Sequence, residues 1–591
     1  MCGIAGLMSG DGTSPAIQML NAMADAVEHR GPDGIGHYHT NDVALVQTRL
    51  AIIDLETGDQ PLYASRPDDD QDICLIANGE IYNFVELREQ MTDVGFKTKS
   101  DCEPILHLYM EHGIDFAEHL RGMYAIALHD PADEALILAR DPFGIKPLYY
   151  GQTADGFAFA SELQALLAAK LAKPIVETAK RDELLALQFT TGAETPIAGV
   201  YRLLPGETIV IRGGRVAERK IIDALPPGGP KSISRSDAVQ KFDDVIMNSV
   251  DVHQRADVPY GMFLSGGTDS SVVLAAMRRL NPTPVQALTA GFGDTSVNDE
   301  REHARAVAGA AGADHHEIDV TDDDFWRELP AIAHAMDDPA ADYAIVPTYF
   351  LARKAREMGL KVVLSGEGGD ELFAGYGRYR RALRPALFGG RQMRHAPILD
   401  GLDVLREPSP HWRDGIAADE TKAKAHGRNR LQMAQATDSA GWLANDLLIK
   451  LDRCLMAHGV EGRVPFLDPY VADFAFTLPN NIKIRNRNGK WVLREWLSTA
   501  LPESKPFTKK RGFTVPVGEW IASKGNKLGP LVAAQQGVFE VCDTPAVEKL
   551  FNSGSEFGKA QWTLLFYALW HQSHILGADV SGSVFDVLAD A

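Results

Sequence analysis

A glycine-rich turn with nearby acids and hydroxyls lies near the middle of the chain, between a predicted strand and a predicted helix. It reads Leu264-Ser265-Gly266-Gly267-Thr268-Asp269-Ser270-Ser271 and follows the apolar run 258–263. Adjacent glycines let the backbone approach an anion, and the amides at a helix start donate to it. The turn lacks the Gly-Lys-Ser/Thr ending of a P-loop, and Asp269 offers an oxygen ligand for Mg²⁺ instead. We predict a phosphate site of another type, with a simple helix-capping turn as the alternative.

A second turn of the same kind follows a later predicted strand. It reads Leu364-Ser365-Gly366-Glu367-Gly368-Gly369-Asp370-Glu371-Leu372-Phe373-Ala374-Gly375-Tyr376. Asp370 could hold Mg²⁺ against a triphosphate together with Asp269, because Mg²⁺ is usually bound by a few carboxylates and the phosphates themselves. Glu367 is a candidate base for an attacking amine. Solvated acids in a glycine turn are the alternative.

Charged residues nearer the C-terminus fall into two groups. Lys510 and Arg511, within the run 507–516, could meet the charge that develops as pyrophosphate leaves, although a solvated basic run would look the same. Polar residues set among apolar helices are more typical of structural ion pairs. We therefore expect ion pairs at Asp452, Arg453, Glu461 and Arg463.

The first residues could form a nucleophile with its own base. The chain begins Met1-Cys2-Gly3-Ile4-Ala5-Gly6. Methionine before a small residue is normally removed, which would leave Cys2 with the free α-amino group. An amine with a pKa of about 8 can take the thiol proton and act as general base. A small cysteine tucked under a sheet is the structural alternative.

Three segments downstream carry the groups that an amidase acting on an amino acid needs. Such an enzyme needs a guanidinium for the substrate carboxylate, a carboxylate for its amine, and amide donors for an oxyanion. Arg49, Asp101 and the pair Asn78-Gly79 could supply them in that order. Taken singly, a surface ion pair, a helix cap and a hairpin turn explain these residues equally well.

Composition narrows the class of protein. A chain of 591 residues needs several domains, and 45% hydrophobic with 24% charged residues is typical of soluble globular proteins. The net charge of −21 argues against nucleic acid or an anionic membrane as partner. No apolar run reaches the length of a membrane span, and no secretion signal is evident. The five cysteines show neither metal spacing nor a disulfide pattern, so we expect a cytoplasmic protein.

The elements that would position the two glycine-rich turns alternate between strand and helix. Apolar runs at 258–263, 285–291, 315–320 and 360–364 are separated by helical patterns, and the Pro- and Gly-rich stretch 222–235 precedes a helix at 236–253. Alternation of this kind predicts a doubly wound parallel sheet, with ligands bound at the carboxyl ends of its strands. Both glycine-rich turns lie at such ends.

The N-terminal motifs resemble the glutaminase domain of the class II glutamine amidotransferases. The resemblance runs from Cys2 to about Pro205 and includes the segments 140–149 and 160–162. It implies an N-terminal-nucleophile fold, an αββα sandwich, with Cys2 as nucleophile. The other roles that it implies are an oxyanion hole at Asn78 and Gly79, and glutamine binding by Arg49, Glu80 and Asp101.

The motifs from the first glycine-rich turn to about Trp520 resemble the synthetase domain of the asparagine synthetase family, of the ATP-pyrophosphatase type. The resemblance implies a metal site at Asp269 and Asp370, a role near the amine for Glu367, and stabilisation of adenylation by Lys510, with Lys509 as the weaker rival. The nucleotide-binding positions that we carry over are Leu264, Ser265, Gly266, Gly267, Asp269, Ser270, Ala290, Ser365, Gly366 and Tyr376.

We therefore expect a two-domain protein of α/β and α+β class. Residues 1–215 form the glutaminase, 216–235 the linker, and 236–591 a parallel-sheet synthetase domain with a helical C-terminal part. The expected activity is amidation of aspartate with glutamine, ATP and Mg²⁺, ammonia passing between two sites. Alternatives are another carboxylate acceptor, such as a sugar acid, peptide or metabolite, and a relative that only binds partners. Asp338, Asp342 and Arg378 could bind aspartate or be solvated loop charges. The tail from about residue 525 carries no readable motif. Whether the protein forms a homodimer is left open by the sequence.

Overall fold

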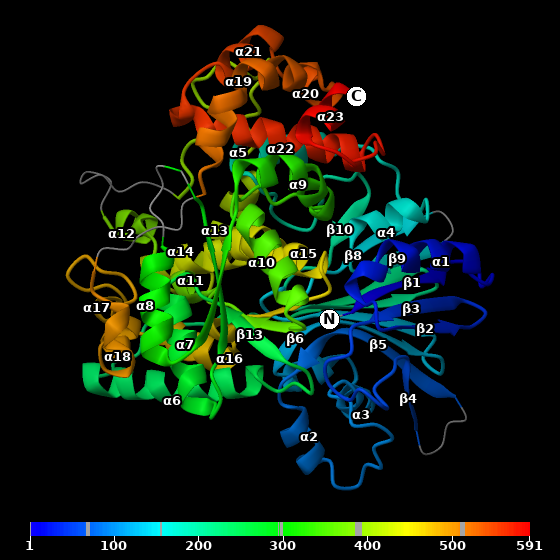
Figure 1. The fold of residues 1–591 in the computed structure, drawn as a ribbon. Helices are drawn as coiled ribbons and strands as arrows, with labels where there is room; N and C mark the ends of the chain where they lie inside the picture. The colour runs from blue at the N-terminus through cyan, green and yellow to red at the C-terminus, as the bar shows by residue number, and fades with distance from the viewer. Residues whose placement is uncertain are drawn as a thin grey trace.

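The computed structural model describes residues 2–66, 71–153, 156–293, 295, 300–384, 393–508 and 515–590. Figure 1 shows an N-terminal part made mainly of strands beside a part in which helices surround a smaller sheet. Within these ranges, none of the helices has the length and apolar character that crossing a membrane requires.

Two antiparallel sheets form the N-terminal part, each with six strands among the described residues. The first has the order β10-β8-β9-β1-β3-β2 and the second β12-β11-β7-β6-β5-β4. The strands of the first sheet are β1 (Gly3–Ser9), β2 (Gly34–His39), β3 (Val43–Arg49), β8 (Tyr149–Thr153), β9 (Gly156–Ala160) and β10 (Val200–Arg202). Those of the second are β4 (Leu62–Ser65), β5 (Asp72–Ile81), β6 (Gly122–Asp130), β7 (Ala135–Arg140), β11 (Glu207–Arg212) and β12 (Arg215–Ile221).

Helices cover the outer faces of both sheets, which gives the predicted αββα sandwich. Apolar side chains of the two sheets meet in one core, with Ile4 and Val43 from the first sheet and Ile76 and Leu138 from the second. Helices α1 (Ile17–Ala26) and α4 (Leu163–Ala168) pack outside the first sheet, and α3 (Glu103–His112) packs outside the second. Cys2 thus directly precedes the strand β1, which lies inside the first sheet between β9 and β3.

A parallel sheet organises the second part of the chain. Its order is β15-β14-β13-β16-β17, and each neighbouring pair is parallel. The strands are β13 (Tyr260–Phe263), β14 (Gln286–Gly291), β15 (Asp314–Asp319), β16 (Val362–Leu364) and β17 (Glu461–Arg463). Figure 1 shows α7 (Thr268–Leu280) and α8 (Arg301–Ala311) on one side of this sheet and α10 (Ile345–Glu357) on the other, as a doubly wound fold requires.

The predicted elements of this domain are present with small shifts at their ends. The helix expected at 236–253 is α6 (Arg235–His253), which Ser234 caps through its side chain. The strand expected at 258–263 is shorter, because β13 begins at Tyr260. The sequence did not indicate the edge strand β17 or the helix α9 (Asp322–Ala335).

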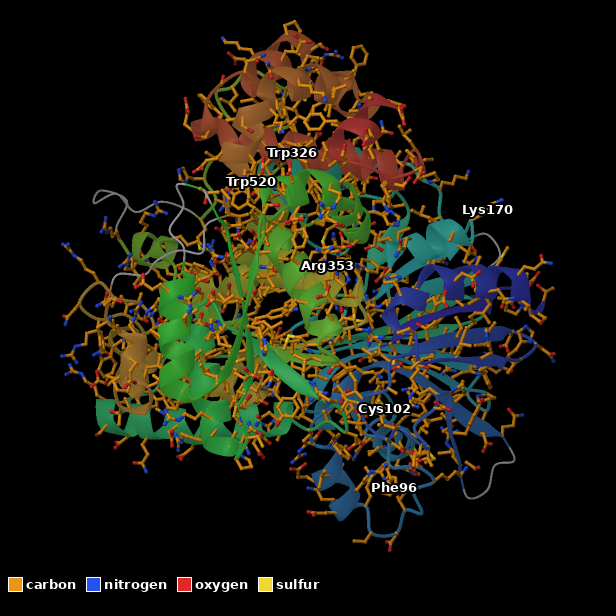
Figure 2. The ribbon with its side chains drawn as sticks, viewed as in Figure 1. Phe96, Cys102, Lys170, Trp326, Arg353 and Trp520 are labelled. Carbon is orange, nitrogen blue, oxygen red and sulfur yellow. The ribbon has the colours of Figure 1, made fainter. Side chains whose placement is uncertain are left out.

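The C-terminal residues form a helical layer over α9. Trp520 of this layer packs on Phe325, with ring centroids 5.0 Å apart, and Trp326 of α9 packs on Phe585 at 5.1 Å. Figure 2 shows Trp326 and Trp520 where the C-terminal layer meets the rest of the domain. The helices of the layer are α19 (Val517–Ala534), α20 (Gln536–Phe539), α21 (Thr544–Phe551), α22 (Gly558–His574) and α23 (Val584–Ala589). The tail is therefore part of the folded core.

The remaining helices lie around the three sheets. In the N-terminal part they are α2 (Phe84–Gln90) and α5 (Thr178–Leu187). In the second part they are α11 (Gly369–Leu372), α12 (Gly377–Ala382), α13 (Asp414–Lys424), α14 (Arg430–Asp438), the π-helical segment η4 (Ser439–Leu447), α15 (Leu448–Met456), α16 (Pro469–Thr477), α17 (Asn480–Lys483) and α18 (Trp491–Ala500).

Candidate active sites

Cys2 is buried directly before β1. Its backbone N–H donates to Asn78 Oδ1 at 3.1 Å, and Arg30 Nε donates to the Cys2 carbonyl at 3.2 Å. Burial raises the pKa of the Cys2 thiol, while the positive charge of Arg49 lowers it. The thiol therefore needs a nearby base to ionise at neutral pH.

Asn78 and Gly79 lie next to each other in β5, close to Cys2. Asn78 is fully buried, and its Nδ2 has no hydrogen-bond partner among the described residues. A buried donor without a partner costs free energy unless a ligand satisfies it. Gly79 is required by close packing, because a Cβ there would lie 2.2 Å from the Met123 carbonyl oxygen. The pair can therefore supply donors to an oxyanion beside the thiol.

The three predicted glutamine ligands lie in the same buried region as Cys2, which is the candidate glutamine pocket. Arg49 ends β3 and contacts Asp59 Oδ1 and the Asp54 carbonyl, each at 2.5 Å. The Asp59 side chain is 82% exposed, so water weakens this ion pair. Burial raises the pKa of Asp101 to about 6. Burial and the charge of Glu461 also raise the pKa of Glu80 well above its usual range, since carboxylates crowd this pocket.

The second candidate site is a cavity of about 640 Å³ at the carboxyl ends of the parallel strands. It lies between the two glycine-rich turns, as the sequence predicts. The residues named from the sequence that line it are Leu264, Ser265, Gly266, Gly267, Asp269, Ser270, Ala290, Ser365, Gly366, Glu367, Asp370 and Tyr376. A cavity of this size is typical of small-molecule sites.

The first turn has the geometry of an anion site. Gly266 takes a φ of +68°, which favours glycine, and Gly267 precedes the first residue of α7. The Ser265 and Ser270 hydroxyls lie 3.1 Å apart, so both face the same small space. The amides at the start of α7 and these hydroxyls can donate to phosphate oxygens.

Glycines bring the two acidic turns into contact. A Cβ on Gly369 would lie 2.6 Å from the Asp269 carboxyl carbon, and one on Gly366 would lie 2.9 Å from the Asp269 Cβ. Asp370 lies on the next residue of the same turn. The two carboxylates therefore meet because the glycines leave room for them.

Lys490 joins these two carboxylates and was missed from the sequence. Its Nζ lies 2.5 Å from Asp269 Oδ2 and 2.6 Å from Asp370 Oδ1. It follows the Asn488-Gly489 turn directly before α18, and this position just before a helix was the only available signal. Lys509 and Lys510, to which the sequence gave the stabilising role, lie outside the described residues.

A further group of charges lines the cavity near Glu367. Lys450 Nζ lies 3.4 Å from Glu367 Oε1 and 3.6 Å from Asp342 Oδ2. Asp342 lines the cavity together with Lys450 and Glu367. Asp338 does not, because it is buried against Arg202 at 2.5 Å, between the two domains.

Tyr376 and Arg378 form the aromatic side of the cavity and its surroundings. Tyr376 donates to Glu371 Oε1 at 2.8 Å, and its ring packs on Trp442, another cavity residue. Arg378 lies over both rings and pairs with Asp438 at 2.7 Å. Its guanidinium is thus bound by protein groups rather than solvated.

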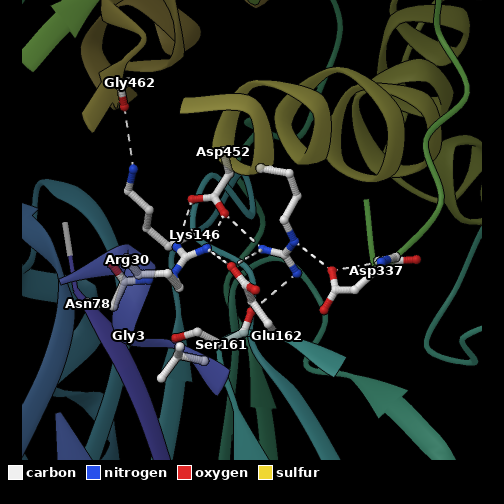
Figure 3. A network of polar contacts seen from close by, with 12 residues as sticks. Gly3, Arg30, Asn78, Lys146, Ser161, Glu162, Asp337, Asp452 and Gly462 are labelled. Atoms are coloured by element: carbon white, nitrogen blue, oxygen red, sulfur yellow. Dashed lines mark hydrogen bonds and ion pairs between the residues drawn. The ribbon is translucent and has the colours of Figure 1, made fainter. Parts of the chain in front are cut away.

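Buried ion pairs join the first site to the second domain, and the ion pairs predicted at Asp452 and Arg453 are confirmed (Figure 3). Arg30 donates to both Asp452 oxygens, at 2.8 and 3.0 Å. Arg453 binds Asp337 at 2.7 Å, and Glu162 lies 2.5 Å from Arg30. Arg30 also holds the Cys2 carbonyl, so this network reaches the first site from a helix of the second domain.

An αββα sandwich with a buried cysteine at its first strand, joined to a parallel-sheet domain with an anion-type turn, defines a two-domain enzyme of the glutamine amidotransferase class. Family models agree: "Glutamine amidotransferase domain" matches residues 1–221 and "Asparagine synthase" matches residues 241–572. The chain belongs to the asparagine synthase family.

Its relatives span nearly the whole chain. "Asparagine synthetase [glutamine-hydrolyzing] 1" of Bacillus subtilis (strain 168) is 32% identical over 97% of each chain. "Asparagine synthetase B [glutamine-hydrolyzing]" of Escherichia coli (strain K12) is 29% identical over 91% of this chain and 86% of its own. "Amidase chyE" of Penicillium rubens is 27% identical over 88% of this chain and 89% of its own.

Proposed function

We propose that this enzyme hydrolyses glutamine at Cys2 and uses the ammonia to convert aspartate into asparagine, with ATP cleaved to AMP and pyrophosphate. The observation that carries the proposal is the cavity in which the two glycine-rich turns, Asp269, Asp370 and Lys490 meet. We place the glutaminase in residues 1–215, the linker in 216–235 and the synthetase in 236–591.

In the glutaminase half of the proposal, Cys2 attacks the amide carbon of glutamine once Met1 is removed. Its α-amino group takes the thiol proton and returns it to the leaving ammonia. Asn78 Nδ2 and the Gly79 amide donate to the developing oxyanion. The lack of a partner for Asn78 Nδ2 among the described residues supports this assignment. Arg49 would exchange Asp59 for the substrate carboxylate, and Glu80 and Asp101 would accept from its ammonium.

In the synthetase half, the aspartate side-chain carboxylate attacks the α-phosphorus of ATP and forms β-aspartyl-AMP. The first turn, through Ser265, Gly267 and Ser270, would hold the departing pyrophosphate. Lys490 stands where negative charge develops, and Lys510 keeps its proposed role from the family resemblance. Ammonia then attacks the acyl-adenylate, and Glu367 takes a proton from the attacking nitrogen.

Mg²⁺ fits the carboxylates of Asp269 and Asp370 in this proposal. Both are hard oxygen donors, and both already converge on one cationic atom, Nζ of Lys490. When bound, Mg²⁺ would neutralise charge on the triphosphate. Lys490 must then give up at least part of its contact with the two carboxylates.

The relatives bear on which acceptor is used. Those at 32% and 29% identity are named asparagine synthetases, which supports aspartate, whereas the similarity to an amidase supports another carboxylate. Incubating the purified enzyme with ATP, glutamine and aspartate should yield asparagine, AMP and pyrophosphate in equal amounts. Pyrophosphate release with a different carboxylate and none with aspartate would favour the alternative acceptor.

Replacing Cys2 by alanine separates the two proposed sites. Cys2→Ala should abolish glutamine-dependent synthesis and leave ammonia-dependent synthesis within about twofold of wild type, because the thiol acts only on glutamine. Product formation with glutamine or with ammonium chloride measures both. Cys74→Ala, at a buried cysteine in β5 outside both sites, is the matched control. Loss of both activities in Cys2→Ala would contradict the two-site scheme.

A further inference from the structure

Arg463 brings a side chain of the second domain to the glutamine pocket of the first. It ends β17, it is fully buried, and its Nη2 lies 3.3 Å from Glu80 Oε2. Glu80 follows Asn78 and Gly79 in β5. One of the residues proposed to bind glutamine is therefore in contact with the other domain.

The second domain holds the Arg463 guanidinium from three directions. Nε donates to Glu461 Oε1 at 2.6 Å, and Nη1 donates to the His253 carbonyl at 2.9 Å and to the Arg255 carbonyl at 2.7 Å. Because the guanidinium is planar, fixing Nε and Nη1 also fixes the position of Nη2. The group that faces Glu80 is therefore set in place by its own domain.

Glu80 depends on this contact. It is 4% exposed, and Oε2 has no partner with hydrogen-bond geometry among the described residues. Glu461 and Asp101 add negative charge around it, and of the side-chain cations Arg463 opposes them most strongly. Burial and Glu461 raise the pKa of Glu80 well above its usual range, so the charged form that an ammonium needs depends on compensation by Arg463 and by the ammonium itself.

We propose that Arg463 is a positioning residue for glutamine: from the synthetase domain it fixes the Glu80 carboxylate so that Glu80 accepts the α-ammonium of the substrate. This inference rests on the proposed glutaminase activity. It adds a residue of the second domain to the specificity of the first site. Arg463 itself does not touch the reacting amide.

The test compares Arg463→Lys with Arg121→Lys in the full-length enzyme. Arg121 is the matched control, because it also forms a buried ion pair between the domains, with Asp468 at 2.7 Å, but does not contact Glu80. Ammonia release is measured with glutamine and with 4-carbamoylbutanoate, which lacks the α-amino group. Thermal unfolding reports the stability of each variant.

Arg463→Lys should raise the KM for glutamine about 10-fold or more with kcat within about threefold, because lysine cannot keep the fixed fork. Its preference for glutamine over 4-carbamoylbutanoate should fall by a similar factor. Ammonia-dependent synthesis should stay within about twofold. Arg121→Lys should keep both the KM and the preference, whatever its unfolding temperature.

An unchanged KM and preference in Arg463→Lys, or equal changes in Arg121→Lys, would overturn the inference. If Arg463→Lys does not fold, Arg463→Gln provides the test, since its amide can still donate to a backbone carbonyl of the second domain but carries no charge toward Glu80. The preference for glutamine should then fall about threefold or more, and a full preference would overturn the inference. Absence of any glutamine hydrolysis by wild type would instead refute the proposed function.

Discussion

Lys490 is the residue on which the two acidic turns converge. It contacts Asp269 and Asp370 from a left-handed backbone position, with a φ of +58°, directly before α18. Its N–H donates to the Phe373 carbonyl at 3.0 Å, so the turn around Asp370 also holds its backbone. The cation is thus placed by two elements before any ligand arrives.

Removing this cation should affect only the nucleotide half of the reaction. We expect Lys490→Gln to lower acceptor-dependent pyrophosphate release by about 100-fold or more, the effect typical of losing one charge-stabilising donor. Glutamine hydrolysis should stay within about twofold, because Cys2 lies in the other domain. Lys549→Gln, on an exposed lysine of α21, serves as the control. Equal loss of both activities would speak against this role.

Lys483 should make the stability of the protein depend on pH. Its Nζ donates to Gln435 Oε1 and the Phe476 carbonyl, and burial lowers its pKa to about 7. An unfolded lysine has a pKa near about 10.4. Between these values the unfolded chain holds a proton that the folded chain has lost. Folding stability therefore rises with pH from about 7 to about 10, and below 7 this residue adds no pH dependence.

Comparison with Lys483→Met isolates this effect. The free energy of unfolding of wild type minus that of the variant should be constant below pH 7. It should then shift in favour of wild type by about 1–3 kcal/mol between pH 7 and pH 9. Urea denaturation at pH 6, 7, 8 and 9 measures it. A difference that does not change over this range would contradict a lysine that loses its proton on folding.

At the scale of elements, α15 connects the two sites. One part of this helix presents Lys450 to the cavity, and Asp452 and Arg453 reach the network around Arg30. It follows directly from η4, a π-helical segment of a kind that often occurs at functional sites. A change in α15 can therefore affect either site.

Asp452→Asn should weaken both the fold and the first site. It removes the charge that Arg30 contacts through two hydrogen bonds, and breaking a buried pair of this kind costs about 3–5 kcal/mol. Arg30 also holds the Cys2 carbonyl, so glutamine hydrolysis should fall as well. Thermal unfolding and ammonia release check both effects. Asp473→Asn, at an exposed position of α16, is the control and should change neither the unfolding temperature nor ammonia release. An Asp452→Asn variant that unfolds at the wild-type temperature would contradict the prediction.

At the scale of the whole molecule, one apolar core crosses the domain boundary. It contains Ala5 of β1, Leu20 of α1, Met262 of β13 and Leu564 of α22. Because these elements share buried surface, we expect a single unfolding transition in differential scanning calorimetry. Two well-separated transitions would show that the domains unfold independently.

Sequence reasoning reached both candidate sites because each contributing segment is a short local motif. Apolar runs followed by glycine and acid are local patterns, and the glycines are where the packing needs them. Gly366 and Gly369 face Asp269, and no larger residue fits there. The spacing of glycines and acids in the sequence was therefore enough to predict the acidic turns.

The remaining contacts could not be predicted, because their partners are far apart in sequence. Arg30 and Asp452 are separated by 422 positions, and nothing near either residue indicates the other. Helix α22 is buried on nearly all sides, which removes the polar and apolar alternation by which helices are identified. Its Trp562 donates to the Ala341 carbonyl at 2.6 Å, beside the cavity residue Asp342.

The contact between Glu80 and Arg463 also bears on how the protein is made. Ribosomes synthesise the chain from its N-terminus, so Glu80 emerges 383 residues before Arg463 does. At about 5–20 residues per second, that interval lasts roughly 20–80 s. Throughout it the nascent first domain lacks the residue that positions Glu80. Glutamine would then be spared from wasteful hydrolysis until the domain that consumes the ammonia has begun to fold.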